Sequence, residues 1–123
     1  MTIKILSSPS GSRWFKNSRL HREDGPAIEW SNGSKEWYLE GKIHRIDGPA
    51  LIRNDGYKQW YIDDKLHRLD GPAIENPVSH LNEWWINNRK FSKREFPIAV
   101  ITFLLKCNFD SASVLVEYFN VAS

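Results

Sequence analysis

Three histidines and three aspartates recur at fixed spacing, and they are the side chains of this sequence best suited to chemistry. Each histidine stands three residues before an aspartate, in the pairs His21 and Asp24, His44 and Asp47, His67 and Asp70. Such side chains can bind metal ions or act as acid and base. A catalytic site needs different residues in different roles, however, and these copies are nearly identical. We therefore predict a structural role in turns and loops, with no metal, cofactor or catalytic residue.

An arginine follows each histidine, and an aromatic residue stands seven positions before each arginine. Arginine and aromatic residues are favoured at interface hot spots, so the pattern predicts a partner-binding surface. Stacking combined with positive charge could also hold single-stranded nucleic acid. The candidate partner-binding residues are Phe15, Tyr38, Tyr61, Trp85, Arg22, Arg45, Arg68, His21, His44 and His67.

Composition and motifs argue against several classes of protein. The net charge is only +2, from 17 Lys and Arg against 15 Asp and Glu, whereas non-specific nucleic-acid binders usually carry a strong basic excess. The longest apolar run, 98–105, is far shorter than the roughly twenty residues of a membrane span. There is no Ser-His-Asp order, phosphate loop or zinc-ligand spacing. We expect a soluble, cytoplasmic, non-catalytic protein.

A tandem repeat organises these residues. Trp14, Trp37 and Trp60 are 23 residues apart, and Trp84 follows after 24. The first three units share a second aromatic residue and the sequence His-Arg-x-Asp-Gly-Pro-Ala. The fourth unit keeps only its first half, as terminal repeats often do. The units lie near 12–34, 35–57, 58–80 and, in degenerate form, 81–94.

Each unit is typical of a β-hairpin. In the second unit, residues 35–39 predict a strand, 40–41 a turn, 47–49 a second bend and 50–53 another strand, and Asn54-Asp55-Gly56 closes a hairpin. In the second bend, the glycine is expected to permit unusual φ and the proline to fix it. We expect the tryptophan row to form the core and the second aromatic row to lie on the opposite face. Residues 1–94 thus predict one twisted antiparallel meander sheet of tandem hairpins.

The tail makes the fold mainly β with a small α part. Residues 95–106 and 112–119 predict one or two short helices, although β-branched residues leave strand open for 111–121. We expect residues 95–123 to belong to the same domain and to cover or cap the sheet, folding back onto one face. Without that cover, the apolar surface would favour a homodimer through the tail.

The repeat resembles a divergent MORN-type repeat over roughly residues 12–90. The matching features are Trp37-Tyr38, Glu40-Gly41-Lys42 and Asp47-Gly48. Ordinary MORN units carry more glycines, and here Pro-Ala follows the second bend. This version resembles repeats in small proteins of phages, large viruses and bacteria, some of them antitoxin-like. The resemblance implies the architecture and does not identify a ligand.

Three functions remain open at this point. The first is a non-catalytic protein-binding module, such as a phage-encoded inhibitor of a bacterial host enzyme or defence complex, anti-CRISPR-like or antitoxin-like. The second is nucleic-acid or anionic-lipid binding through the arginine and aromatic rows. The third is a structural or oligomerising protein.

Overall fold

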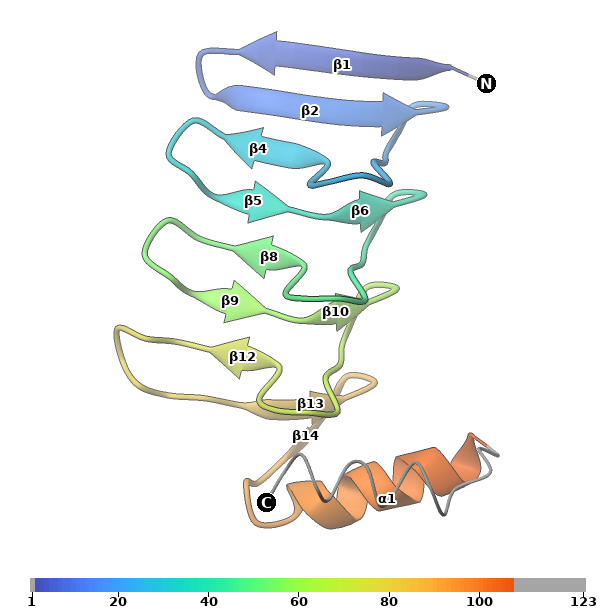
Figure 1. Ribbon diagram of the computed structural model, residues 1–123, viewed down its shortest axis with the longest axis vertical. Helices are drawn as coiled ribbons and strands as arrows, with labels where there is room; N and C mark the ends of the chain where they lie inside the picture. The colour runs from blue at the N-terminus through green and yellow to red at the C-terminus, as the bar shows by residue number, and fades with distance from the viewer. Residues whose placement is uncertain (1, 108–123) are drawn as a thin grey trace.

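The protein forms a ladder of antiparallel strands with a helix at one end (Figure 1). The computed structural model describes residues 2–107 of the 123 in the chain. Strands stack from the N-terminal β1 toward the last hairpin, in the order of the sequence repeats. The predicted mainly β fold with an open antiparallel meander sheet is confirmed.

The strands belong to one large sheet and a set of small hairpins. The large sheet has eight strands, in the order β1-β2-β4-β5-β8-β9-β12, with β3 paired to β2. Its bounds are β1 (Ile3–Ser8), β2 (Gly11–Lys16), β3 (Arg19–Leu20), β4 (Ile28–Trp30), β5 (Lys35–Glu36), β8 (Leu51–Ile52), β9 (Lys58–Gln59) and β12 (Ile74–Glu75). The small hairpins are β6 (Tyr38–Leu39) with β7 (Lys42–Ile43), β10 (Tyr61–Ile62) with β11 (Lys65–Leu66), and β13 (Trp84–Ile86) with β14 (Arg89–Phe91).

Each repeat contains more than the two strands expected from the sequence. In the second unit, β5 pairs with β4 and β8 in the large sheet, and β6 then pairs with β7 as a separate hairpin. Trp37 lies at the junction between β5 and β6. Its N–H donates to the carbonyl oxygen of Ala50 at 2.8 Å, and the N–H of His44 donates to its carbonyl oxygen at 3.0 Å. The junction is therefore bonded on both sides, which keeps the two hairpins of a repeat in fixed register.

The small hairpins turn where the sequence predicts, at residues with positive φ. In the third unit, Asp63 and Asp64 have φ of 46° and 66°. Two consecutive residues in this region are the mark of the tight hairpin turn whose twist matches that of the strands. Asp and Asn tolerate this region better than most side chains do. The equivalent positive-φ pairs are Asn17 and Ser18, Glu40 and Gly41, and Asn87 and Asn88.

The helix α1 (Phe96–Lys106) closes the end of the ladder beside the last hairpin. A reciprocal pair of hydrogen bonds precedes it, because the N–H of Ser92 donates to Glu95 Oε1 at 3.0 Å and the N–H of Glu95 donates to Ser92 Oγ at 3.1 Å. Pro97 stands in the first turn, where a missing N–H costs nothing. The predicted helix over 95–106 is thus confirmed within a residue.

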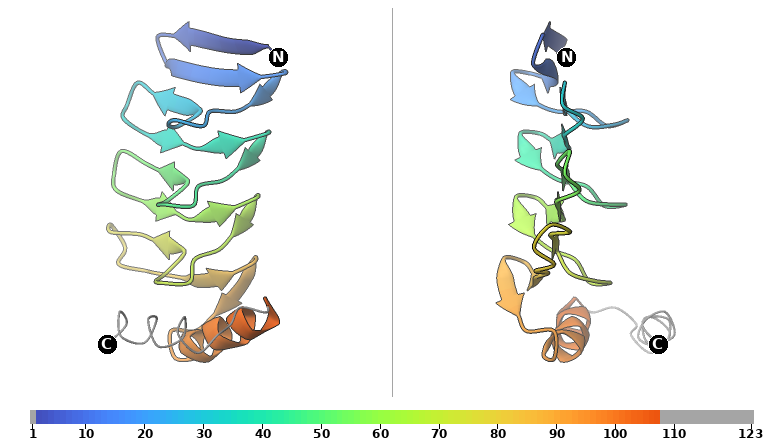
Figure 2. Two further views of the ribbon diagram at one scale, coloured as in Figure 1. Left: turned by 45° about the vertical axis from the view of Figure 1, so that its right-hand side comes forward. Right: turned by 90° about the vertical axis from the view of Figure 1, so that its left-hand side faces the viewer.

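The position of α1 differs from the expectation that it folds back onto a face of the sheet. Figure 2 shows α1 lying across the end of the ladder, and the sheet stays one layer thick above it. Among the described residues, a buried cluster lies between α1 and the last hairpin and consists of Ile86, Phe96, Val100 and Leu104. The apolar face of the helix therefore packs against the last hairpin. The predicted second segment, 111–121, lies outside the described residues. No helix in residues 2–107 is long and apolar enough to cross a membrane.

Candidate binding surface

The arginine of each second bend is fixed by four kinds of contact. The Cζ atom of Arg45 lies 4.0 Å from the centre of the Trp37 ring, within the range of a cation–π interaction. Its Nε donates to Asp47 Oδ1 and its Nη1 donates to the carbonyl oxygen of Pro49, both at 3.1 Å. Its backbone N–H donates to the carbonyl oxygen of Tyr61 in the next repeat, also at 3.1 Å. Arg45 therefore joins its own bend to the following hairpin.

The other two bends repeat this arrangement. Arg22 lies 4.1 Å from the ring centre of Trp14 and Arg68 lies 3.8 Å from that of Trp60. Both also donate from Nη1 to a glutamate, Glu29 at 3.3 Å and Glu75 at 2.8 Å. The second repeat has Ile52 at this position, so Arg45 lacks that bond. The hydrogen bond from Arg22 and its positive charge hold the pKa of Asp24 below its ordinary value.

The glycine of each bend makes room for the arginine. A Cβ atom added to Gly48 would lie 3.0 Å from the Cζ of Arg45, and one added to Gly71 would lie 2.9 Å from the Cζ of Arg68. Neither glycine has positive φ. The expectation that these glycines supply an unusual φ was wrong: they are needed because the guanidinium occupies the space of a side chain.

The tryptophan row is half-buried and does not form the core that the sequence predicted. An arginine lies over each of the first three rings, so the row is covered by cations of its own chain. The completely buried residues of the bends are Ala27, Ala50 and Ala73. Their carbonyl oxygens accept the backbone N–H of Trp14, Trp37 and Trp60. Because that contact brings backbones together, the small alanine side chain is what fits.

The histidines connect successive repeats. Nδ1 of His44 accepts the N–H of Asp63, at the first position of the next turn, at 3.1 Å. The equivalent bonds run from Glu40 to His21 at 2.9 Å and from Asn87 to His67 at 3.2 Å. The ring of His67 also lies 5.1 Å from that of Phe103 in α1. Burial lowers the pKa of His67 below its ordinary value of 6.5, which keeps Nδ1 available as an acceptor.

The second aromatic row is half-buried and bonded within the chain. The hydroxyl of Tyr38 donates to Glu36 at 3.0 Å, and the hydroxyl of Tyr61 donates to Gln59 at 3.2 Å. Burial, with the negative charge of Glu36, raises the pKa of Tyr38 to about 12. Nε1 of Trp85 donates to Glu83 at 3.1 Å. Phe15 lies at the same position in β2 and carries no polar atom.

The aspartates of the bends accept hydrogen bonds from arginine side chains, and the histidines accept from turn amides of the next repeat. The ten candidate residues lie in three rows along the ladder, one of aromatic residues, one of arginines and one of histidines. The role of those residues in partner binding stays a prediction. Within residues 2–107, no group of three or more His, Cys, Asp or Glu side chains could hold a metal ion.

The structure displays a further row that the sequence reasoning missed. A basic residue follows the turn between β2 and β3 and the turn of each small hairpin, and each of these side chains is exposed. None of them forms an ion pair with a described residue, in contrast to the arginines of the bends. The pattern was visible as a cation five positions after each repeat tryptophan. We call this set the basic row, and it consists of Arg19, Lys42, Lys65 and Arg89.

The basic row follows the stacking of the repeats. An added Cβ on Gly41 would lie 3.6 Å from the Cβ of Arg19, so the turn of one hairpin touches the cation of the hairpin before it. Two strand spacings separate successive hairpins, which places neighbouring cations about 10 Å apart. Acidic residues stand beside the row, at Glu40 and Asp63 in the turns. The bond from Lys16 to Glu40, at 3.1 Å, lowers the pKa of that carboxyl.

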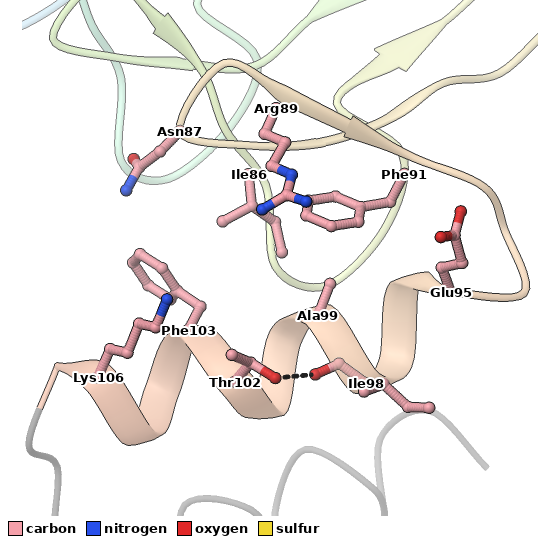
Figure 3. Close-up of a pocket in the computed structure, with 10 residues that line it drawn as sticks. All are labelled: Ile86, Asn87, Arg89, Phe91, Glu95, Ile98, Ala99, Thr102, Phe103 and Lys106. Atoms are coloured by element: carbon pink, nitrogen blue, oxygen red, sulfur yellow. Dashed lines mark hydrogen bonds between the residues drawn. The ribbon is translucent and has the colours of Figure 1, made fainter.

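A groove of about 630 Å³ lies beside the last cation of the row, between the last hairpin and α1 (Figure 3). The guanidinium of Arg89 lies 5.3 Å from the ring centre of Phe91 at one wall. Ile98 and Phe103 of α1 line the other.

The chain matches no protein-family model, no curated protein and no solved structure.

Proposed function

We propose that this chain is a non-catalytic protein-binding module that docks an acidic protein surface on the basic row. The observation that carries the proposal is the regular series of exposed cations without an ion-pair partner among residues 2–107, one in each hairpin. Exposed cations of this kind are well hydrated in the free protein. They form charge-assisted hydrogen bonds only when an acidic partner binds. A rigid ladder holds the cations at a fixed spacing, which favours one complementary partner over others.

Two features favour a protein over nucleic acid or anionic lipid. Glu40 and Asp63 lie beside the cations and would repel a continuous line of phosphates, whereas a protein partner can present separate charges of both signs. The arginines predicted to bind phosphate, Arg22, Arg45 and Arg68, already hold aspartates within the chain. Binding of nucleic acid or lipid is the second candidate function, and a row of four cations is the feature that would carry it.

The identity of the partner is proposed from the resemblance to repeat proteins of phages and bacteria. On that basis the partner is a bacterial enzyme or defence complex, and the chain is a phage-encoded inhibitor that acts in the host cytoplasm. The ladder supports this proposal by offering a rigid, charged surface.

Affinity capture from a bacterial lysate treated with nuclease tests the proposal. The bait is wild-type protein beside a variant with Arg19→Glu, Lys42→Glu and Lys65→Glu. The matched control carries Lys35→Glu, Arg94→Glu and Lys106→Glu, three exposed cations outside the row that give the same change in net charge. All variants are first shown to fold by circular dichroism.

We expect wild type and the control to capture an acidic protein in a stoichiometric amount. The variant with the reversed charges in the basic row should not capture it. Equal retention by all three baits would contradict binding by the basic row. Recovery of nucleic acid alone from untreated lysate, with no protein lost on charge reversal, would replace the proposal with the second candidate function.

A further inference from the structure

Among residues 2–107, the strand β1 leaves one edge of the large sheet open. Within this part of the chain it pairs with β2 on one side only, and its six residues are all exposed. An open edge presents unpaired N–H and C=O groups and attracts other strands. Proteins usually protect such edges with charges, prolines or bulges, but β1 carries a single charge, on Lys4, and no proline.

The hydrogen bonds on the other side of β1 show which of its backbone groups face outward. The N–H of Asn17 donates to the carbonyl oxygen of Thr2 at 2.9 Å, so Thr2 faces β2. The backbone N–H and C=O groups of successive residues point to opposite sides of a strand. Those of Lys4, Leu6 and Ser8 therefore also face β2. The N–H and C=O groups of Ile3, Ile5 and Ser7 face the open edge.

These three residues are arranged symmetrically about Ile5. If a second copy of the chain runs antiparallel against this edge, Ile5 lies opposite its own counterpart and Ile3 lies opposite Ser7 of the other copy. Every outward-facing group of the three residues then has a partner, with none left over. A two-fold axis through Ile5 relates the copies, as a closed dimer requires.

Side chains on both faces fit this register. Ile3 and Ile5 are 66% and 55% exposed, and Ile5 shares a face with Trp14 through the pairing of β1 with β2. The two Ile5 side chains would join the tryptophan rows of both copies across the axis. On the other face, Lys4 would lie opposite Leu6 and not opposite its own counterpart, so no like charges meet directly.

We propose that two copies of this chain pair through β1 in antiparallel register centred on Ile5, which makes one continuous sheet across the dimer. The other end of each ladder is covered by α1, so pairing through β1 closes after two copies and does not build a fibre. The contact is independent of the basic row and of the predicted pairing through the tail.

One strand pair buries less surface than a standard stable interface, so the dimer is a weak one, with a dissociation constant on the order of 100 µM. Sedimentation equilibrium from about 5 µM to about 1 mM should show a reversible change from monomer to dimer. A monomer at every concentration would overturn the proposal.

Charge variants test the register. With Ile3→Lys and Ser7→Lys, two pairs of like charges face each other, and the dissociation constant should rise about tenfold or more. With Ile3→Glu and Ser7→Lys, opposite charges face each other in the same places, and dimerisation should be retained. A control with Ser31→Lys and Asn54→Lys adds the same charge at exposed loops and should dimerise like wild type. A dimer unaffected by either β1 variant would overturn the proposal.

Amide hydrogen exchange of the wild type tests it without any substitution. The amides of Lys4, Leu6 and Ser8 should be protected at low concentration, and that of Ile5 should exchange freely. At high concentration the Ile5 amide should become protected. Unchanged exchange at Ile5 across the dimerisation range would exclude β1 as the interface.

Discussion

At the scale of single residues, each bend is built around one arginine. The planar guanidinium stacks on tryptophan, pairs with aspartate and donates to a proline carbonyl, and lysine cannot make all three contacts at once. The Arg45 side chain is 25% exposed. Solvent therefore weakens its ion pair with Asp47, but it has less effect on the stacking and on the hydrogen bond to Pro49. The repeated Arg-x-Asp-Gly-Pro sequence is therefore a packing unit.

Substitution of Arg45 and Gly48 should reveal this dependence. Arg45→Ala is expected to lower the free energy of unfolding by about 2 kcal/mol, because the stacking and the bond to the carbonyl are lost. Gly48→Ala should cost about 1 kcal/mol, since its Cβ would displace the guanidinium. Urea denaturation measures both values.

The double variant separates this explanation from a general effect on the bend. If Gly48 only makes space for the arginine, Gly48→Ala should cost nearly nothing in the Arg45→Ala background. Additive effects of the two substitutions would show that the glycine has another role.

At the scale of elements, the repeats are held together by bonds between each turn and the unit before it. The first turn residue donates to a histidine, and the second donates to a backbone carbonyl, as Asp64 does to Ile43 at 2.9 Å. The carboxylate of Asp64 also accepts the N–H of Ile43 at 2.9 Å. A protonated histidine has no acceptor nitrogen, so protonation of His67 should break its bond to the N–H of Asn87.

The pH dependence of stability should show this at His67. Its pKa is lowered in the folded protein, so the unfolded chain binds the proton more readily. The contribution of His67 is fully present above about pH 6.5 and is lost as the pH falls from there toward the lowered value. Thermal unfolding between pH 5 and pH 8 measures it, in the range that brackets the ordinary histidine pKa.

The control for that experiment is His67→Gln, which keeps an acceptor and does not titrate near neutrality. Its stability should change less between pH 7 and pH 5 than that of wild type. Equal pH dependence in the two proteins would show that His67 does not contribute in this way.

At the scale of the whole molecule, a one-layer ladder has little core of its own. In the part of the chain that the structure describes, the cluster of buried residues lies at the helical end and consists of Ile86, Phe96, Val100 and Leu104. Along the rest of the ladder, buried alanines, arginine–tryptophan stacks and turn bonds connect each repeat to its neighbours. In such a structure stability is nearly a sum of units and their contacts, and an end unit needs a cap.

Substitutions in α1 should show that the buried face of the helix contributes to stability and that its exposed face does not. Leu104 is 6% exposed, and Leu104→Ala should lower the free energy of unfolding by about 3 kcal/mol through the lost burial and the cavity. Ile98 is 71% exposed, and Ile98→Ala should change it by no more than about 0.5 kcal/mol. Urea denaturation compares the two variants.

Amide exchange should locate the effect of Leu104→Ala. The Arg68 N–H, bonded to Trp85 in the last hairpin, should lose protection before the Arg22 N–H, bonded to Tyr38. Uniform loss of protection along the chain would mean that the ladder unfolds as one unit.

The repeat, the turn positions and the helix could all be predicted because each depends on local sequence. Asp63 and Asp64 tolerate positive φ wherever they occur, and the 23-residue spacing forces equivalent residues into rows. The interior could not be predicted in the same way. Trp37 has the composition of a core residue, but its burial depends on whether another layer covers the sheet.

Sequence by itself therefore determined the antiparallel repeat ladder, because local backbone preference and periodicity fix strands, turns and stacking order. Tertiary structure alone decided which cationic side chains are available to a partner and which are held by contacts within the chain. Arg45 and Lys42 carry the same charge three residues apart, yet Arg45 is held by Trp37 and Asp47 while Lys42 is exposed at the hairpin. The reason is physical: a side chain's availability depends on groups that meet only when the chain folds, as Trp37 and Pro49 meet at the guanidinium of Arg45.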